Sequence, residues 1–377
     1  MKIVSVVGTR PQLIKAAALQ PVLRRDHEDI FVDTGQHYDH VMAGSFFGEL
    51  GLAEPDHALG IGGGGHGAQT GRMLIALERL LESAAPDAVV VYGDTNSTLA
   101  GALAAAKLGI PVAHVEAGLR SHDRRMPEEL NRLVADHLSS WHFAPTDAAV
   151  ANLAAEGIVE GVFLVGDLML DLAARISAEV RDPAALAEVA ARLGLPLLPG
   201  RFVFATVHRA ENRTPEAIAA WAGLLGAVAS SQRPVVLALH PGTRVALEAA
   251  GVELPATVLV VEPQGYRSSL ALQLHSAAVL TDSGGVQRES AWLGVPCLVL
   301  RRTTEWVETV GGPDSSAVLI GLDSEAALRE MASRAPLERS PQLAAERAAG
   351  LRLEGAGAAE KISAALRTRP AGTAVRA

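Results

Sequence analysis

Short runs of β-branched residues alternate with Ala- and Leu-rich stretches along most of the chain, and this alternation restarts once. The first series predicts strands at 2–7, 29–34, 87–92, 111–115 and 161–165, with helices such as 11–25, 69–83 and 96–108 between them. The second series predicts strands at 201–206, 234–239, 257–261, 277–281 and 295–300. Strands that alternate with helices form parallel sheets covered on both faces. The sequence therefore predicts an α/β protein with two doubly wound, Rossmann-like domains.

The segment 167–200 separates the two series and carries turn signals at Asp182-Pro183 and at 195–200. We therefore expect an N-terminal domain at 1–167 and a C-terminal domain at 168–357. Ligands of open α/β sheets bind beyond the carboxyl ends of the strands, so two such sheets facing each other would form a cleft. The tail from 339 is expected to be helical to about Arg367 and disordered from Arg369.

Charge and composition exclude several classes of protein. The formal net charge is −9, whereas a nucleic-acid-binding protein needs clustered cations, so no nucleic-acid partner is expected. Helix N-termini can still bind a polyanion. No stretch approaches 18 uninterrupted apolar residues and the opening run is too short for a signal peptide, so we expect no membrane span and a cytoplasmic location. The single cysteine, Cys297, lies in an apolar run and is expected to be an unreactive core thiol.

Two polar motifs follow strands of the first series. Gly8-Thr9-Arg10-Pro11 comes after the first strand, with Lys15 about one helical turn later. This segment fits a phosphate- or sugar-binding turn and an ordinary βα turn equally well. Gly93-Asp94-Thr95-Asn96-Ser97-Thr98 comes after another strand. A helix cap accounts for one Asp or Thr there, but not for the whole polar cluster.

A third motif, at 114–120, contains Glu116 directly after an apolar strand, and Glu128 and Glu129 lie shortly beyond it. A carboxylate in this position needs a partner, and Arg120 or Arg132 could be a purely structural one. Glu128 and Glu129 also suit the first turn of a helix. Asp94, Glu116 and Glu128 are nevertheless expected to gather at one sheet edge, as groups that transfer protons do.

The second series carries two further motifs. His208 and Arg209 end its first strand within Thr206-Val207-His208-Arg209-Ala210-Glu211-Asn212 and suit a diphosphate. Ser283-Gly284-Gly285 lies between a strand and a helix, where glycine admits a phosphate to the N–H donors of the helix. Glu289, about one turn later, suits a ribose. An ordinary glycine turn is the alternative. The chain has no Walker A or GxGxxG fingerprint and no compact metal-ligand spacing, so neither a nicotinamide site nor a metal site is expected.

In this order the motifs resemble those of the non-hydrolysing UDP-N-acetylglucosamine 2-epimerases. The resemblance covers about residues 1–320 and depends on GTRP, GDT, HVEAGLR, PEE-x-NR, HR-x-EN, HP-x-T and DSGG-x-Q. It implies a two-domain fold like that of glycosyltransferase-B enzymes, a homodimer, and a C-terminal helix, within 358–377, that returns to the first domain. It implies a UDP-amino sugar substrate and no cofactor.

The same resemblance implies the roles of individual residues. Asp94, Glu116, Glu128 and His208 match the catalytic set. The matching substrate-binding residues are Arg10, Lys15, His240, Ser283, Gly284, Gly285 and Glu289.

The implied reaction is reversible C2 epimerisation of UDP-N-acetylglucosamine to UDP-N-acetylmannosamine. It proceeds by anti elimination of UDP to a 2-acetamidoglucal, followed by re-addition. Departure of UDP gives C1 oxocarbenium character, which makes the C2 proton labile to a carboxylate base. We expect Glu116 or Asp94 to be a base and His208 to support the diphosphate.

Some segments depart from the usual pattern of the family. The usual GTRPE reads GTRPQ here, with Gln12 in place of Glu. The segments 34–39, 67–72 and 304–308 resemble the branch that epimerises UDP-2,3-diacetamido-2,3-dideoxyglucuronate. Asp39 stands near a position where substrate-activated members carry a second Gln, so the resemblance does not imply activation by a second substrate molecule here. The competing hypotheses are a glycosyltransferase-B-type transferase, a hydrolysing epimerase and a non-catalytic sugar-nucleotide binder.

Overall fold

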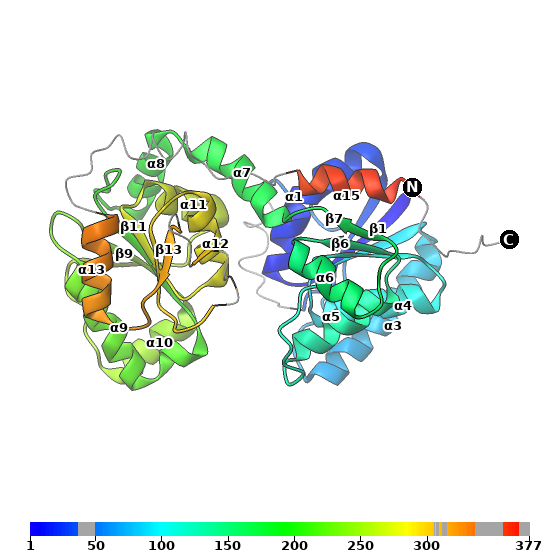
Figure 1. The fold of residues 1–377 in the computed structure, drawn as a ribbon, viewed down its shortest axis with the longest axis horizontal. Coiled ribbons are helices and arrows are strands. Elements are labelled where there is room, and N and C mark those ends of the chain that lie inside the picture. Colours follow the sequence, from blue (N-terminus) through cyan, green and yellow to red (C-terminus); the bar gives the residue numbers. More distant parts are fainter. Residues whose placement is uncertain (37–49, 305, 307–308, 311–314, 336–356, 369–377) are drawn as a thin grey trace. The chain divides into compact units, whose positions relative to one another are not determined.

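A computed structural model describes residues 1–36, 50–304, 306, 309–310, 315–335 and 357–368. The contacts divide the chain into two compact units. Unit 1 comprises the described residues within Met1–Leu172 together with the C-terminal helix, and unit 2 comprises those within Ala173–Glu354. Figure 1 shows a sheet with flanking helices in each unit. The predicted α/β class with two doubly wound units is confirmed.

Unit 1 is built on a seven-stranded sheet in the order β3-β2-β1-β4-β5-β6-β7. All of its strand pairs are parallel. The strands are β1 (Lys2–Val7), β2 (Glu28–Asp33), β3 (His57–Ala58), β4 (Ala88–Tyr92), β5 (Val112–Val115), β6 (Trp141–Ala144) and β7 (Val162–Leu164). The helices are α1 (Arg10–Asp26), α3 (His66–Ala84), α4 (Asn96–Lys107), α5 (Pro127–Leu138), α6 (Asp147–Ala155) and α15 (Ala358–Leu366).

Unit 2 is built on a six-stranded parallel sheet in the order β10-β9-β8-β11-β12-β13. The strands are β8 (Val203–Val207), β9 (Val235–Leu239), β10 (Val258–Val261), β11 (Ala278–Thr281), β12 (Cys297–Val299) and β13 (Ala317–Leu319). The helices are α8 (Pro183–Leu193), η1 (Ala210–Arg213), α9 (Pro215–Val228), α10 (Pro241–Ala250), α11 (Tyr266–His275), α12 (Gly284–Trp292) and α13 (Ser324–Arg334). The helix α7 (Leu168–Val180) begins in unit 1 and ends in unit 2.

The two sheets have separate hydrophobic cores. In unit 1, Val4, Val6, Val89 and Val91 pack against Met73 and neighbouring residues of the helices. In unit 2, Val203, Val235 and Leu280 pack against Trp221 and the helices around it. The central strands β4 and β9 are buried along their whole length, as expected for parallel strands with helices on both faces. Each unit therefore buries its sheet within itself.

The helix α15 belongs to unit 1 and lies beside α1 (Figure 1). Asp171 accepts hydrogen bonds from the N–H groups of Gly357 and Ala359 at 2.6 and 2.8 Å, which caps the start of α15. Ser363 donates to Asp26 at 2.7 Å. The helical tail predicted from 339 can be judged only at 357–368, because 336–356 and 369–377 lie outside the described residues.

Candidate active site

The first group of candidate residues lies where the strand order of unit 1 reverses. The chain winds outward from β1 to β2 and β3 on one side, and from β4 to β7 on the other. In such sheets the crevice at the reversal, beyond the carboxyl ends of the strands, is the usual ligand site. Arg10 follows β1 and is exposed, and Asp94 follows β4. The fold therefore brings the first two sequence motifs to one place.

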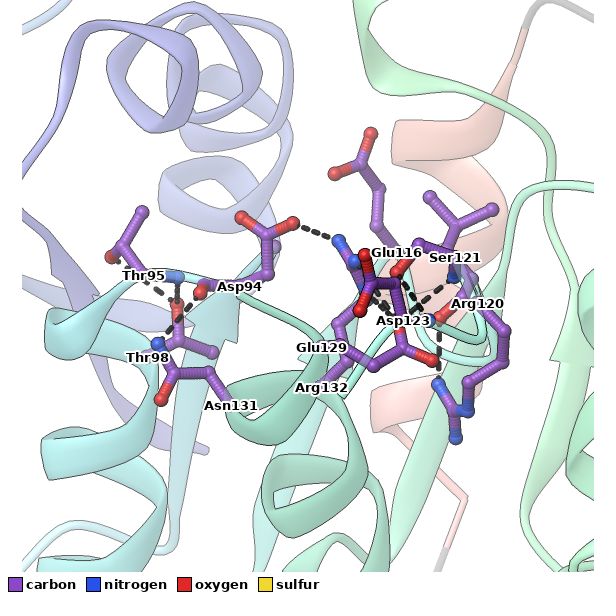
Figure 2. A network of polar contacts seen from close by, with 12 residues as sticks. Asp94, Thr95, Thr98, Glu116, Arg120, Ser121, Asp123, Glu129, Asn131 and Arg132 are labelled. Carbon is purple, nitrogen blue, oxygen red and sulfur yellow. Dashed lines mark hydrogen bonds and ion pairs between the residues drawn. The ribbon is translucent and has the colours of Figure 1, made fainter. Parts of the chain in front are cut away.

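The three carboxylates expected to cluster in unit 1 do so. Glu116 is ion-paired with Lys15, and both side chains are largely buried. Asp94 is ion-paired with Arg132 and feels the charges of Lys15, Glu116 and Glu128. Figure 2 shows Asp94 directed toward Arg132, with Glu116 nearby. Arg120 pairs with Asp136 and Glu156, so the structural partner suggested for Glu116 is corrected to Lys15.

Asp94 has an altered affinity for protons. Burial is the largest influence and raises the pKa of its carboxyl group. The charges of Arg132 and Lys15 oppose this shift, whereas Glu116 and Glu128 reinforce it, and the net result is a raised pKa. A carboxyl group with a raised pKa beside an ion-paired carboxylate is an arrangement typical of acid and base partners.

Glu116 adopts a backbone conformation that few residues other than glycine adopt. Its φ is +69°, in the left-handed region. The surrounding backbone holds it there, because the N–H groups of Glu116 and Ala117 both donate to the carbonyl of Phe143, at 3.1 and 3.2 Å. Strain of this kind persists where the surrounding structure enforces it, and it is common at functional sites.

Glu128 and Glu129 differ in their surroundings although they are adjacent. Glu128 is half-buried near Asp94 in the first turn of α5. Glu129 is buried and accepts hydrogen bonds from the N–H groups of Ser121 and His122, both at 2.9 Å, and from Arg132. Burial alone would raise the pKa of Glu129, but these hydrogen bonds lower it to about 2. Glu129 therefore holds the loop and Arg132 in place, and Glu128 remains the candidate for chemistry.

The second group of candidate residues lies where the strand order of unit 2 reverses, between β8 and β11. Asp282, which follows β11, is fully buried and accepts from the ring nitrogen Nδ1 of His208 at 2.7 Å. It also accepts from the N–H groups of His208 and Arg209, at 3.0 and 2.9 Å, and from Asn212. Burial alone would raise the pKa of Asp282, but these donors lower it. Asp282 thereby fixes the orientation of His208.

The loop at 283–285 leads directly into α12. The hydroxyl of Ser283 accepts from the N–H of Val286 at 3.4 Å and caps the helix. Among the described residues, a Cβ atom added at Gly285 would meet only the Ser283 hydroxyl within 4 Å, at 3.8 Å, so these residues leave space beside the first turn. Gly8 differs, because a side chain there would overlap Thr34 and Ser97. Glycine therefore serves packing at Gly8 and leaves room for a ligand at Gly285.

Two other predicted ligand contacts also lie in unit 2. His240 follows β9, is exposed, and accepts from the N–H of Gly242 through Nδ1 at 3.1 Å, which caps α10. Glu289 is buried in α12 and accepts from Gln273 at 2.7 Å. His240 and His208 thus follow the neighbouring strands β9 and β8, whereas Glu289 is buried within α12.

The family model described as UDP-N-acetylglucosamine 2-epimerase matches residues 22–367. This match covers most of the chain and includes both groups of candidate residues except Arg10 and Lys15. The chain belongs to the UDP-N-acetylglucosamine 2-epimerase family. The predicted family and the predicted class of enzyme, an isomerase, are confirmed.

Relatives of this 2-epimerase family support the assignment over most of their length. The chain is 44% identical over 342 residues to a UDP-N-acetylglucosamine 2-epimerase homolog of Methanococcus maripaludis, covering 89% of this chain and 93% of that one. It is also 44% identical over 316 residues to UDP-2,3-diacetamido-2,3-dideoxy-D-glucuronate 2-epimerase of Pseudomonas aeruginosa. This match covers 82% of this chain and 86% of that one. The crystal structure of Methanocaldococcus jannaschii UDP-GlcNAc 2-epimerase with UDP-GlcNAc and UDP superposes with a TM-score of 0.75. That protein is 37% identical to this chain, and the match covers 90% of this chain and 94% of that one.

Gln12, where the 2-epimerase family usually has Glu, lies in the interior of the protein. Its carbonyl oxygen accepts from the N–H of Gly8 at 2.8 Å, and its amide group donates to the carbonyl of Tyr92 at 2.6 Å. The amide also donates to the hydroxyls of Thr95 and Thr98. The residue is 1% exposed. Gln12 therefore ties β1 to β4, and its identity carries no direct information about the sugar.

The other segments that depart from the usual family pattern are only partly described. Gln36 accepts from the N–H of Ser97 at 2.9 Å, and Gln69 accepts from Asn96 at 2.8 Å, so both support the start of α4. Arg288 stacks on the ring of Trp306 at 3.7 Å from its centroid. The residues 37–39, including Asp39, and Glu305, Val307 and Glu308 lie outside the described residues.

Several residues in this 2-epimerase were not assigned a role from the sequence. Asp282 is one, although its place between a buried strand and Ser-Gly-Gly was a usable signal. Arg132, in the PEE-x-NR motif, was suggested only as a structural partner of Glu116, and the structure pairs it with Asp94 instead. The network of His114, Asp136 and Arg120 under Glu116 could not be found from spacing alone.

Three expectations outside the site can be compared with the structure. Cys297 is fully buried, so its expected place in the core is confirmed, and burial raises its pKa to about 12, which is in keeping with an unreactive thiol. Within the described ranges, no three or more His, Cys, Asp or Glu side chains form a group that could hold a metal ion. No helix in that same part of the chain is long and apolar enough to cross a membrane.

Proposed function

We propose that this protein epimerises C2 of a UDP-linked N-acetylated amino sugar by anti elimination of UDP to a 2-acetamidoglucal, followed by re-addition. The observation that carries the proposal is the cluster of Asp94, Glu116 and Glu128 at the strand reversal of unit 1, in a chain of the 2-epimerase family. A binding protein would not need three carboxylates with two buried cations among them.

The chemistry explains why these groups are needed. The C2 proton is not adjacent to a carbonyl, so direct deprotonation would be prohibitively slow. Cleavage of the C1–O bond sends the electron pair to UDP and builds oxocarbenium character, which makes the C2 proton labile. A carboxylate then takes that proton and the C1–C2 double bond forms. Protonation of C2 on the opposite face, with return of the UDP oxygen to C1, gives the inverted product.

We assign different roles to the two principal carboxyl groups. Glu116 faces Lys15, which favours the ionised form, so it is suited to accept the C2 proton. The raised pKa of Asp94 suits a group that is protonated for part of the cycle and donates to C2 from the other face. In the reverse direction the roles exchange. Glu128 supports both charges from the first turn of α5.

We assign the leaving diphosphate to unit 2. Ser283, Gly284 and Gly285 would present the N-terminus of α12 to it, which supplies N–H donors and partial positive charge. His208, oriented by Asp282, would bind the phosphate and stabilise the charge that develops as UDP leaves. Glu289 would bind the ribose. Arg10, Lys15 and His240 would complete the substrate contacts, and unit 1 would bind the sugar.

The preferred substrate is UDP-N-acetylglucosamine, with UDP-N-acetylmannosamine as product. This choice is supported by the family and by the ligands named for the Methanocaldococcus jannaschii structure. The second candidate is UDP-2,3-diacetamido-2,3-dideoxyglucuronate, because the Pseudomonas aeruginosa enzyme named for it is as similar to this chain as the Methanococcus maripaludis homolog is. The expected homodimer and cytoplasmic location stay predictions.

The experiment that tests this proposal uses each of the two UDP sugars in D₂O, followed by proton NMR. Epimerisation predicts a product that is still UDP-linked, inverted at C2 and deuterated at C2. Turnover of only the diacetamidoglucuronate would retain the mechanism and change the substrate. Release of free sugar would replace the proposal with hydrolysis, and the absence of any change with both sugars would overturn it.

A further inference from the structure

A fully buried histidine lies directly beneath the carboxylate cluster. His114 is the third residue of β5 and is 0% exposed. Its Nε2 lies 2.7 Å from the carbonyl oxygen of Gly93, and its Nδ1 lies 2.6 Å from a carboxylate oxygen of Asp136. Gly93 precedes Asp94, and Glu116 follows His114 by two residues. The ring therefore joins the ends of β4 and β5 where the candidate catalytic groups begin.

The hydrogen bonds define the charge of this ring. A backbone carbonyl only accepts, so Nε2 carries a proton. The second carboxylate oxygen of Asp136 accepts from the N–H of Gly118 at 3.1 Å and from Arg120 at 2.7 Å. Burial alone would raise the pKa of Asp136, but His114 and Arg120 lower it to about 2, so the carboxylate is ionised. Nδ1 therefore donates to Asp136 and also carries a proton. With both nitrogens protonated, His114 is an imidazolium.

The charged groups around His114 come from three elements. Asp136 of α5 and Glu116 of the turn after β5 both favour its charge, whereas His142 is its register partner on β6 and has its own pKa lowered, first by burial and also by the charge of His114. Burial alone would lower the pKa of His114, but Asp136, Gly93 and Glu116 outweigh burial and the pKa is raised. The hydrogen-bond geometry and the surrounding charges agree on the ionised form.

This network holds the two turns that carry the candidate acid and base. Glu116 has a φ of +69°, which costs energy for a residue with a side chain, so its turn depends on restraints from outside, whereas Gly93 adopts its φ of +59° without strain. His114 fixes the carbonyl of the first, and Asp136 fixes Gly118 in the second. Asn152 also donates to the carbonyl of Gly118 at 2.9 Å. Loss of the ring would free the first turn and weaken the second.

We propose that the His114 imidazolium is a positioning residue: it holds the Gly93 and Glu116 turns in register and supplies a buried positive charge that keeps Glu116 ionised as proton acceptor. The part that concerns catalysis rests on the proposed epimerase function. His114 does not touch the reacting atoms, and it acts through Asp94 and Glu116.

The test compares His114→Gln with His142→Gln. His142 is a suitable control because it is also buried, lies on the adjacent strand and contacts α5 through the carbonyl of Asp136 at 2.8 Å. For His114→Gln we expect kcat to fall roughly 10- to 100-fold with little change in KM, as misplaced catalytic groups produce. The acid limb of the kcat profile should move to higher pH, because less of the Glu116 carboxylate is ionised without the cation. His142→Gln should leave kcat and the acid limb close to those of the wild type.

A second measurement needs no activity and no folded variant. Nitrogen-15 spectra of the histidine rings in the wild-type chain should show the His114 ring still doubly protonated at a pH where an ordinary histidine ring has lost a proton. A neutral His114 ring at that pH overturns the inference. An active wild type whose His114→Gln variant behaves like His142→Gln also overturns it. An inactive wild type with a doubly protonated His114 instead contradicts the proposed function and leaves the charge assignment intact.

Discussion

The two units carry their candidate groups at equivalent places but equip them differently. Each group lies beyond the carboxyl ends of the strands where the order of the sheet reverses. Unit 1 has several buried or half-buried charges in alternating pairs, from Lys15 and Glu116 to Arg132 and Asp94. Unit 2 has the buried carboxylate of Asp282 beside His208 and the N-terminus of α12, while its other candidate carboxylate, Glu289, is buried against Gln273. Topology therefore fixes the place of a site, whereas its side chains fix the chemistry.

The largest expected effect is on the proton acceptor of unit 1. Glu116→Gln keeps the shape of the side chain and removes the base, so kcat should fall roughly 10²- to 10⁴-fold. Steady-state kinetics with the accepted UDP sugar measure it. Asp123→Asn is the matched control, because this partly exposed carboxylate lies in the same loop and pairs with Arg125. Near-normal turnover of both Glu116→Gln and Asp94→Asn would contradict the acid–base assignment.

The next effect concerns stability and separates the two units. Asp136→Asn leaves the buried His114 cation without its carboxylate and removes one of the two carboxylates that Arg120 contacts, so it should lower the free energy of unfolding by about 3–5 kcal/mol. Asp282→Asn should cost less, about 1–3 kcal/mol, because its partner His208 is 43% exposed and water can solvate it. Urea unfolding compares the two variants. Equal losses in the free energy of unfolding would show that the buried charges of unit 1 depend on their partners no more than those of unit 2 do.

The loss of folding stability at low pH should come mainly from carboxylates of unit 1. The pKa of Asp136 is lowered from 3.8 to about 2, and that of Glu129 from 4.5 to about 2. Folding is therefore stabilised while these groups are ionised, and this contribution, on the order of 2 kcal/mol each, is lost as pH falls from about 4.5 towards 2. Asp94 has a raised pKa and opposes this trend. The urea concentration at the midpoint of unfolding should fall as the pH is lowered from 7 to 3, and it should fall less steeply in Asp136→Asn than in the wild type.

A smaller effect is expected at the glycine loop of unit 2. Gly285→Ala places a methyl group in open space beside the first turn of α12, so it should weaken UDP binding by about 1.5 kcal/mol, roughly ten-fold in Kd. The fold should not suffer, because Ala favours a helix more than Gly does. Isothermal titration calorimetry with UDP and a thermal melt measure both. An unchanged affinity for UDP would contradict the assignment of the diphosphate to this loop.

The smallest expected effect is at Gln12. Because Gln12 is buried and bonded to Gly8 and Tyr92, Gln12→Glu should change the ratio of kcat/KM for the two UDP sugars by less than about 0.5 kcal/mol, roughly two-fold. Its stability should fall, since a carboxylate cannot donate to the Tyr92 carbonyl. Competition kinetics with both sugars give the ratio. A large change would show that this position influences the sugar after all.

The sequence predicted the fold well because its signal is local. The runs 87–92 and 234–239 are almost continuously apolar, and they became β4 and β9 with small shifts at their ends. The short strands β3, β6 and β13 were not predicted, because two to four residues do not establish a period. The strand predicted at 295–300 is shorter in the structure, at Cys297–Val299.

The candidate site was predicted in its positions and only partly in its interactions. Sequence motifs placed Asp94, Glu116 and Glu128 in one cluster, which the structure brings together. They did not reveal that Lys15 pairs with Glu116, because these residues are far apart in sequence and meet only through the sheet. The positive φ of Glu116 was equally inaccessible, since Glu carries no local preference for it. Long-range pairing and backbone strain require the folded chain.

The central claim is that the C1–O bond to UDP breaks during each turnover. It is tested most directly with a UDP sugar that carries oxygen-18 in the bridge between C1 and the β-phosphate, followed by phosphorus NMR. Reversible elimination frees UDP in the site, where the β-phosphate can rotate, so we expect the label to move from the bridging to the non-bridging positions of recovered substrate and product. Inversion at C2 with the label retained in the bridge would contradict elimination and re-addition.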